Sequence, residues 1–401
     1  MANRQKMQKR KRPLLLFIYV VFLLVLFEGT ARLSFMIPAI SNRLQGDEDA
    51  TWRRMWINRH TKDIEIFYAF DIYDPTKGWI SKPNLRGMKA FDNKVLNTNS
   101  RGLRGEKEFS YSKHPNKARI LILGDSFTFG DEVSDNETYP FYLQKMIPTA
   151  EIINMGVHGY GHDQMLILLK EEGIKYQPDI VILGFMQIDM HRNLLQFRDY
   201  AKPRFILDND KLTIAGSPVP RPEDILNGDW ARPRLYDVWL FFRHKELVIS
   251  GLYAKQMKVV TKRLLDELVV TIEKVGAIPI FVYITTWGEI NNQNTSALGD
   301  INDHNTSASE ESFLFSYCHE NNMIHCFSTR PHFVDKIKHG VEFKPTDHWG
   351  PLGNLIIAEA IYKYLIAQDI VPLQLPHNTS IPNSNKSVSA DAINRAAQLG
   401  R

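Results

Sequence analysis

The segment ARILILGDSFTFG, residues 118–130, decides the fold. Its first half, Arg119–Gly124, is an apolar run that ends at a glycine, as is typical of a strand buried on both faces of a parallel sheet. The second half places Ser126 at the turn from this strand into a helix. This pattern predicts an exposed hydroxyl at the sheet edge, beside the backbone N–H groups that a helix start leaves unpaired. The structural alternative is a serine that only caps the helix of an ordinary loop.

Apolar runs and helical segments alternate through the residues that follow. This alternation predicts an α/β fold with three α/β/α layers and a parallel, flavodoxin-like sheet, in which sites collect at the carboxyl ends of the strands. The further strands are expected at Glu151–Asn154, Asp179–Gly184, Ile278–Ile284 and Met323–Phe327, and the helices at Tyr139–Ile147, Asp163–Glu172, Met257–Val275 and Glu310–His319.

The N-terminal segment predicts a membrane anchor. The run Leu14–Phe27 has no charged side chain, and the first twelve residues carry six Lys and Arg and no acid. Fourteen apolar residues also suit a cleaved signal peptide, but no A-x-A pattern follows and a helix from Pro13 to about Ile37 is long enough to cross a bilayer. Residues 1–37 are therefore expected to be a cytoplasmic basic tip and one transmembrane helix. The basic tip predicts a cytoplasmic N-terminus and a periplasmic or extracellular main domain.

The remaining chain is close to neutral, because removing these six leaves 43 basic against 45 acidic residues. A nucleic-acid partner is not expected without a basic surface on the folded part. The divisions expected after the anchor are a juxtamembrane linker and short-strand leader (38–117), the α/β domain (118–372, with an insertion of a hairpin and loops at about 195–256), and a disordered tail (373–401). Cys318 and Cys326 can form a disulfide in an exported domain, or remain free thiols.

Three motifs resemble the blocks of the SGNH, or GDSL, hydrolase family. Gly124-Asp125-Ser126 is similar to the first block, and the resemblance implies that Ser126 is the nucleophile. In residues 154–161, NMGVHGYG, Gly159 matches the glycine whose N–H joins that of Ser126 in the oxyanion hole. In residues 347–350, DHWG, His348 matches the general base. The resemblance covers residues 119–370. The upstream DPTKGW, KPN and TNSRGLRG segments resemble membrane-anchored members associated with surface polysaccharide acylation.

Two positions depart from the family pattern. Ile188 stands where the family has an asparagine that donates to the oxyanion, and Gln187 or Asn193 is a candidate substitute. The acid that orients the base usually lies two or three residues before it, whereas here Asp347 immediately precedes His348. Neighbouring side chains of an extended segment point to opposite sides. Asp347 therefore orients His348 only in a tight turn, and the alternatives are a backbone carbonyl or a Ser–His dyad.

These motifs together predict a serine-dependent esterase or O-acyltransferase, and the resemblance implies ester-linked acyl groups, mainly acetyl, on a surface glycan or a similar small ester. The residues do not decide between water and a sugar hydroxyl as acceptor. No metal or organic cofactor is implied, since the spacing of His158, His162 and His191 fits no usual metal site. The alternative is a non-catalytic glycan-binding or assembly protein that keeps the SGNH fold. A dinucleotide-binding protein is disfavoured because no GxGxxG follows a candidate strand.

Overall fold

The computed structural model describes residues 2–60, 69–209, 211–291, 307–321, 325–344 and 346–370. Its centre is a five-stranded parallel sheet in the order β11-β10-β7-β5-β6. Counted along the chain, this order is 2-1-3-4-5 read from β6, which is the flavodoxin-like order. The predicted fold class is thus confirmed. The strands are β5 (Ala118–Gly124), β6 (Ala150–Gly156), β7 (Ile180–Phe185), β10 (Ile278–Tyr283) and β11 (His325–Ser328).

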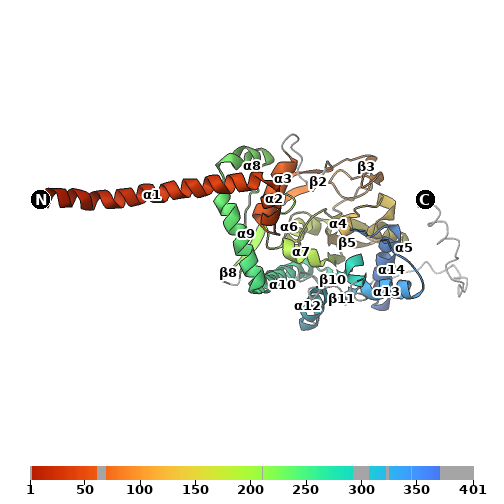
Figure 1. The fold of residues 1–401 in the computed structure, drawn as a ribbon. Helices are drawn as coiled ribbons and strands as arrows, with labels where there is room; N and C mark the ends of the chain where they lie inside the picture. The colour runs from red at the N-terminus through yellow and green to blue at the C-terminus, as the bar shows by residue number, and fades with distance from the viewer. Residues whose placement is uncertain are drawn as a thin grey trace, which may run out of the picture. The chain divides into compact units, whose positions relative to one another are not determined.

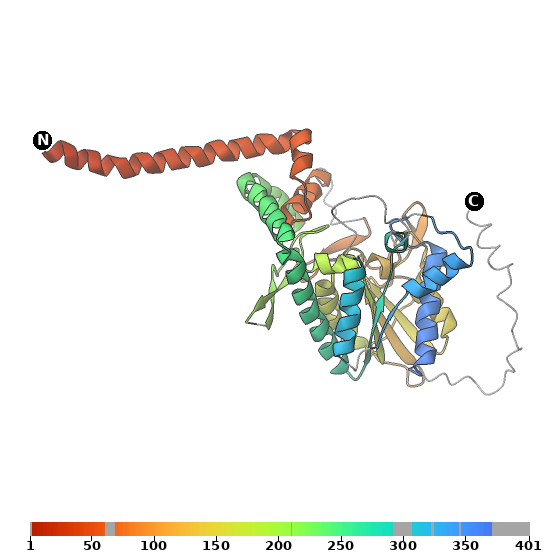
Figure 2. The ribbon, with the colours of Figure 1, turned by 60° about the horizontal axis from the view of Figure 1, so that its bottom comes forward.

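Helices cover both faces of this sheet (Figure 2). Residues of β5 alternate between the two sides: Leu121 and Leu123 belong to the core cluster that also contains Leu166 and Leu265, whereas Ile120 and Ile122 are buried outside that cluster. Every residue of β7 is buried, as expected for a strand with both faces covered. One layer holds α6 (His162–Glu171), α10 (Leu252–Glu273) and α12 (Ser307–Glu320), and the other holds α5 (Tyr139–Met146) and α14 (Pro351–Ala367).

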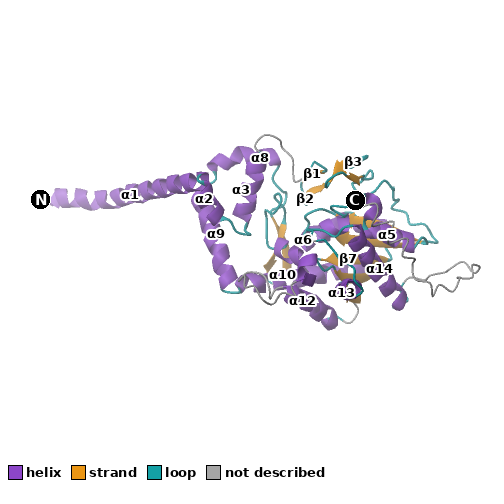
Figure 3. Cartoon of the chain, turned by 45° about the vertical axis from the view of Figure 1, so that its right-hand side comes forward, coloured by secondary structure: helices purple, strands orange, loops and turns teal. Residues whose placement is uncertain are grey.

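The segment before β5 forms helices and two small hairpins outside the central sheet (Figure 3). The first hairpin holds the loop that follows the strand Ala150–Gly156, because Trp79 donates from Nε1 to the carbonyl of His158 at 2.8 Å and its own carbonyl accepts the hydroxyl of Tyr160 at 2.6 Å. The elements are α2 (Pro38–Ser41), the 3-10 turn η1 (Asn42–Leu44), α3 (Asp49–Arg59), β1 (Asp71–Asp74) with β2 (Gly78–Ser81), and β3 (Met88–Ala90) with β4 (Lys94–Leu96).

The insertion contains more helix than the sequence predicts. A hairpin of β8 (Arg204–Asp208) and β9 (Lys211–Ala215) is present as expected, and α8 (Pro222–Gly228) and η4 (Asp229–Ala231) follow. The sixteen-residue helix α9 (Arg234–Ile249) was predicted as loop, which is wrong. The prolines of this region indicated irregular chain, but the last of them, Pro233, is the N-cap of α9 and leaves the helix interior free of proline.

The N-terminal helix α1 (Ala2–Met36) contains one stretch, Pro13–Met36, that is long and apolar enough to span a membrane (Figure 1). Its end is tied to α9. The carboxylate of Glu28 accepts the backbone N–H groups of Arg234 and Leu235 at 2.9 and 3.0 Å, and Arg32 donates to the carbonyl of Trp230 at 3.0 Å. Glu28 therefore satisfies two of the N–H groups that the first turn of α9 leaves unpaired.

Cys318, near the end of α12, and Cys326, in β11, form a disulfide. The sequence left this pairing open. The tail predicted for residues 373–401 lies outside the described residues. The remaining elements are α4 (Ser126–Phe129), η2 (Asp135–Glu137), η3 (Gly173–Tyr176), α7 (Gln187–Arg192), α11 (Trp287–Asn291) and α13 (Arg330–Lys338).

Candidate active site

Ser126 is the first residue of α4, directly after the central strand β5. Asp125 caps this short helix by accepting the N–H of Phe127 at 3.0 Å. The turn requires a glycine at position 124, because a Cβ there would lie 1.9 Å from the hydroxyl oxygen of Thr128. The predicted strand–turn–helix is therefore present. The prediction of an exposed hydroxyl is wrong, since Ser126 is only 4% exposed and lies under the segment that carries His348.

The imidazole of His348 reaches Ser126 from a loop more than two hundred residues later in the chain. Its Nε2 lies 2.8 Å from the Ser126 hydroxyl oxygen. Trp349 anchors this loop: its Nε1 donates to the carbonyl of Thr285 at 2.6 Å, and its ring stacks on Phe333 with centroids 4.1 Å apart. Asn354 of α14 donates to the Trp349 carbonyl at 2.6 Å. Trp349 is thus a buried packing residue that holds the preceding histidine in place.

The other ring nitrogen of His348 contacts Glu132 rather than Asp347. Oε1 of Glu132 lies 3.1 Å from Nδ1 of His348. Asp347 is exposed and lines a cavity beside the pair, so the expectation that it orients the imidazole is not met. Asp347 does not reach the His348 ring because adjacent side chains of an extended segment point to opposite sides. A signal for Glu132 was present in the sequence as two acids, Asp131-Glu132, directly after the GDSFTFG turn.

Glu132 reaches the histidine from an unusual backbone conformation. Its φ is +63°, in the left-handed region that non-glycine residues rarely adopt. This conformation costs of order 1 kcal/mol, and such residues concentrate at functional sites. The preceding residue, Asp131, is buried; its Oδ2 is in close contact with Nδ1 of His158 and lies 3.9 Å from Nε2 of His348. Two carboxylates therefore surround the one imidazole.

The backbone around Ser126 offers unpaired donors. Among the described residues, the N–H groups of Ser126 and Gly159 donate to no protein acceptor. Gly159 lies in the loop after β6, which is held beside the Ser126 turn because Gly124 pairs with Gly156 and accepts the N–H of Val157 at 3.1 Å. The φ of Gly159 is +74°, a conformation that favours glycine. This arrangement agrees with the two backbone donors that the sequence motifs predict.

A third donor can come from Gln187 but not from Asn193. The side chain of Asn193 is fully buried and occupied, because it accepts the N–H of Asp163 at 3.2 Å and donates to the Thr261 hydroxyl at 2.9 Å. Gln187, at the start of α7, makes no side-chain hydrogen bond within the described residues. It lines a cavity of about 320 Å³ together with Phe127, Ile188 and Asp347. Of the two candidate substitutes, only Gln187 lines this cavity, whose wall also includes Phe127, the residue after Ser126.

A buried arginine that the sequence did not single out connects the Ser126 turn, the loop after β6 and helix α7. Nη1 of Arg192 lies 3.0 Å from the Asp125 carboxylate, 2.7 Å from that of Asp189, and 3.0 Å from the carbonyl of Tyr160. Burial, and then the nearby charge of Asp125, raise the pKa of Asp189 well above its ordinary value. Arg192 is the cation that compensates the burial of the Asp125 and Asp189 carboxylates next to each other.

The three histidines considered as a cluster point to different partners. His158 pairs with Asp131, Nδ1 of His162 lies 3.2 Å from Nδ2 of Asn193, and the His191 ring packs on Tyr253 with centroids 5.9 Å apart. Over the described ranges, no group of three or more His, Cys, Asp or Glu side chains is arranged to hold a metal ion.

Comparison with known proteins gives structural similarity without sequence similarity. No protein-family profile and no curated protein matches the chain. Solved structures similar to it include a member of the lipolytic protein G-D-S-L family from Veillonella parvula (13% identity, 64% of this chain and 100% of the other, TM-score 0.35) and an acetylxylan esterase, Axe2, from Geobacillus stearothermophilus (14%, 63% and 96%, 0.36). A two-domain esterase active on acetylated mannans is also similar (13%, 66% and 52%, 0.36). In this chain's own structure, Ser126 and Gly159 follow neighbouring strands of a sheet in flavodoxin-like order, and His348 lies against Ser126.

Proposed function

We propose that this protein is a serine-dependent esterase of the SGNH type. The observation that carries the proposal is the continuous contact from the Ser126 hydroxyl to His348 and on to Glu132, at 2.8 and 3.1 Å. A hydroxyl, an imidazole and a carboxylate in this order make up the arrangement that activates serine as a nucleophile. A serine that serves only as a helix cap requires neither of the other two groups.

The chemistry follows from these contacts. Nε2 of His348 takes the proton of Ser126 as the hydroxyl oxygen attacks an ester carbonyl, and the carboxylate of Glu132 holds the ring with Nδ1 protonated and stabilises the imidazolium. The negative oxygen of the tetrahedral intermediate is received by the N–H groups of Ser126 and Gly159, with the Gln187 amide as third donor. His348 then protonates the leaving alcohol. A second hydroxyl, activated by the same imidazole, takes the acyl group from Ser126.

The finer assignments are part of the same proposal. The acyl group is acetyl or a similar small group carried by a surface glycan, and the acceptor is water or a sugar hydroxyl, because both use the same second step. The apolar Pro13–Met36 stretch anchors the protein, and the six basic residues before it hold the N-terminus in the cytoplasm. The domain then faces the periplasm or the cell exterior, where such glycans are found.

One experiment separates this function from a non-catalytic role. The full-length protein in detergent is given a chromogenic acetyl ester and, separately, a fluorophosphonate that labels activated serines. We expect hydrolysis and stoichiometric labelling, both abolished in Ser126→Ala and unchanged in Ser110→Ala, which alters an exposed serine. Equal ester hydrolysis by Ser126→Ala and the native protein would exclude the esterase. Acetylated glycans are then supplied in place of the chromogenic ester. If the fluorophosphonate labels Ser126 but these glycans are not hydrolysed, Ser126 remains the nucleophile and the glycan assignment is wrong.

A further inference from the structure

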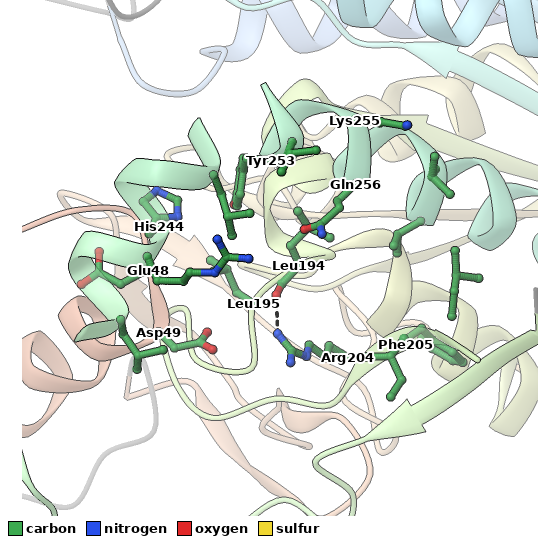
Figure 4. A pocket seen from close by; sticks show the side chains of 18 residues that line it. Glu48, Asp49, Leu194, Leu195, Arg204, Phe205, His244, Tyr253, Lys255 and Gln256 are labelled. Carbon is green, nitrogen blue, oxygen red and sulfur yellow. Dashed lines mark hydrogen bonds between the residues drawn. The ribbon is translucent and has the colours of Figure 1, made fainter. Parts of the chain in front are cut away.

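A second and larger cavity, of about 640 Å³, lies in the insertion rather than beside Ser126. Helices α9 and α10 and strand β8 form its walls, and the start of α3 contributes to its floor (Figure 4). Most of its surface is hydrocarbon, with a few charged side chains among the apolar ones. The apolar residues include Leu194, Phe205, Leu207, Leu240, Leu252 and Val259.

Three polar atoms in the wall of this cavity are buried and have no hydrogen-bond partner within the described chain. They are the hydroxyl of Tyr253, Nε of Arg204 and Oε2 of Glu48. Two other atoms of these side chains do have partners: Arg204 donates from Nη1 to the Leu194 carbonyl at 3.1 Å (Figure 4), and Oε1 of Glu48 accepts the N–H of Thr51 at 3.2 Å. An unmade hydrogen bond at a buried group costs roughly 1–3 kcal/mol. A polar ligand at this position would remove that cost.

The polar groups define the kind of ligand. Arg204 and Tyr253 present N–H and O–H donors, and the basic side chains of Arg243, His244 and Lys255 also line the cavity. The acid Asp49 is occupied, because its Oδ1 accepts the N–H groups of Gln196 and Phe197 at 2.8 and 3.0 Å. Donors and positive charge combined with a hydrocarbon lining fit an anionic amphiphile. Oε2 of Glu48 adds an acceptor that suits a headgroup hydroxyl.

If α1 is the proposed membrane anchor, α9 lies close to the membrane surface and carries this cavity with it. Glu28, directly after the uncharged run Leu14–Phe27 of α1, accepts the N–H groups of the first turn of α9, which then runs across the direction of α1 (Figure 1). The outward side of α9 exposes Trp239, Phe242 and Ile249, the last of them 85% exposed. Aromatic and aliphatic side chains on one face of a helix at the end of a membrane span are typical of a helix lying in the interface. The cavity lies against the same helix.

We propose that this cavity binds one anionic phospholipid drawn from the membrane, with its phosphate near Arg204, Tyr253 and Lys255 and its acyl chain against α9 and α10. The site is separate from the esterase centre, although Tyr253 also packs on His191, which lines the cavity beside Ser126. Burial keeps the Tyr253 hydroxyl protonated, because it raises the pKa of that group. The site therefore has a permanent donor at the position of the phosphate.

The test uses the full-length chain in a mild zwitterionic detergent, mixed with equal amounts of phosphatidylglycerol and phosphatidylcholine of the same acyl chains. Native mass spectrometry counts the lipid that each protein retains. We expect one phosphatidylglycerol per chain, retained about tenfold better than phosphatidylcholine, because only the phosphatidylglycerol headgroup has hydroxyls that can donate to Oε2 of Glu48, and one charge-assisted contact is worth about a factor of ten. Lys255→Glu and Tyr253→Phe should each lower this retention about five- to tenfold, and Leu252→Trp should abolish it by filling the cavity.

Two controls make the result specific. Ile249→Ser removes an exposed side chain of α9 that does not line the cavity, and it should retain the lipid as the native protein does. Ser126→Ala should also retain it, so loss of the esterase and loss of lipid binding are distinguishable. Circular dichroism and thermal melting check that each variant is folded. Equal retention of the two lipids, or full retention by the folded Leu252→Trp variant, would overturn the proposal.

Discussion

Glu132 and His348, 216 residues apart in the chain, meet with 3.1 Å between Oε1 of the carboxylate and Nδ1 of the ring. The opposite ring nitrogen is the one that contacts Ser126. A carboxylate at Nδ1 fixes the tautomer in which Nε2 is free to accept a proton. The acid of this site therefore comes from the segment that follows the nucleophile, and the base comes from the segment before the last helix.

Glu132→Gln should lower kcat by about two to four orders of magnitude with little change in KM, because a side-chain amide can hold the ring in the wrong tautomer. Steady-state hydrolysis of an acetyl ester measures the effect, and thermal melting checks that the variant is folded. An unchanged kcat would show that Glu132 does not orient the base.

Asp347→Asn should change kcat less than threefold, roughly the effect of altering one exposed charge near a site. Its carboxylate is exposed and makes no hydrogen bond or ion pair within the described residues. The same assay and substrate are used, so this variant is the matched control for Glu132→Gln. A loss as large as that of the glutamate variant would return the orienting role to Asp347.

Gln187→Ala should lower kcat by about one to three orders of magnitude if its amide supplies the third oxyanion donor. The neighbour Ile188 lines the same cavity and has no donor, so Ile188→Ala should have a much smaller effect on kcat and act mainly on KM. Conversely, Ile188→Asn should restore part of the activity of Gln187→Ala. Equal effects of the two alanine variants on kcat would assign Gln187 to packing alone.

The central sheet was predictable because its signals are local. Each strand is a short apolar run bounded by turn residues, and a glycine that cannot accept a Cβ stands before Ser126. The meeting of Ser126 and His348 was expected because the resemblance to the SGNH blocks implies a nucleophile and a general base at these two positions.

The other contacts depend on distant packing and on backbone angles that a sequence does not display. Glu132 faces the histidine only because its φ is positive, and Asn193 is unavailable as a donor because Asp163 and Thr261 occupy it. The burial of Ser126 results from the placement of the His348 loop over it. No local sequence pattern indicates that Arg192 binds the carboxylates of Asp125 and Asp189, which come from separate segments of the chain.

Arg192→Met should reduce the free energy of unfolding by about 3–5 kcal/mol, because it leaves Asp125 and Asp189 as buried carboxylates without their shared cation. Urea unfolding followed by circular dichroism measures this change. Lys170→Met breaks an exposed ion pair with Glu267 and should cost less than about 1 kcal/mol. Similar losses in the two variants would mean that the buried arginine contributes no more than a surface pair.

His162 should make the protein less stable as the pH falls from about 6.5 towards 3. Burial, and then the charge of Arg192, lower the pKa of His162 to about 3, against an ordinary value of about 6.5. Between these values the unfolded chain binds a proton that the folded protein does not bind, so the free energy of unfolding decreases with falling pH by up to about 1.4 kcal/mol per unit.

His162→Phe keeps the ring contact with Phe185 and removes the titrating group. Urea unfolding between pH 4.5 and 7.5 should therefore give a shallower pH dependence for His162→Phe than for the native protein. His339→Gln, which alters an exposed histidine, should retain the native slope, and parallel curves for His162→Phe and the native protein would contradict a neutral buried imidazole at this position.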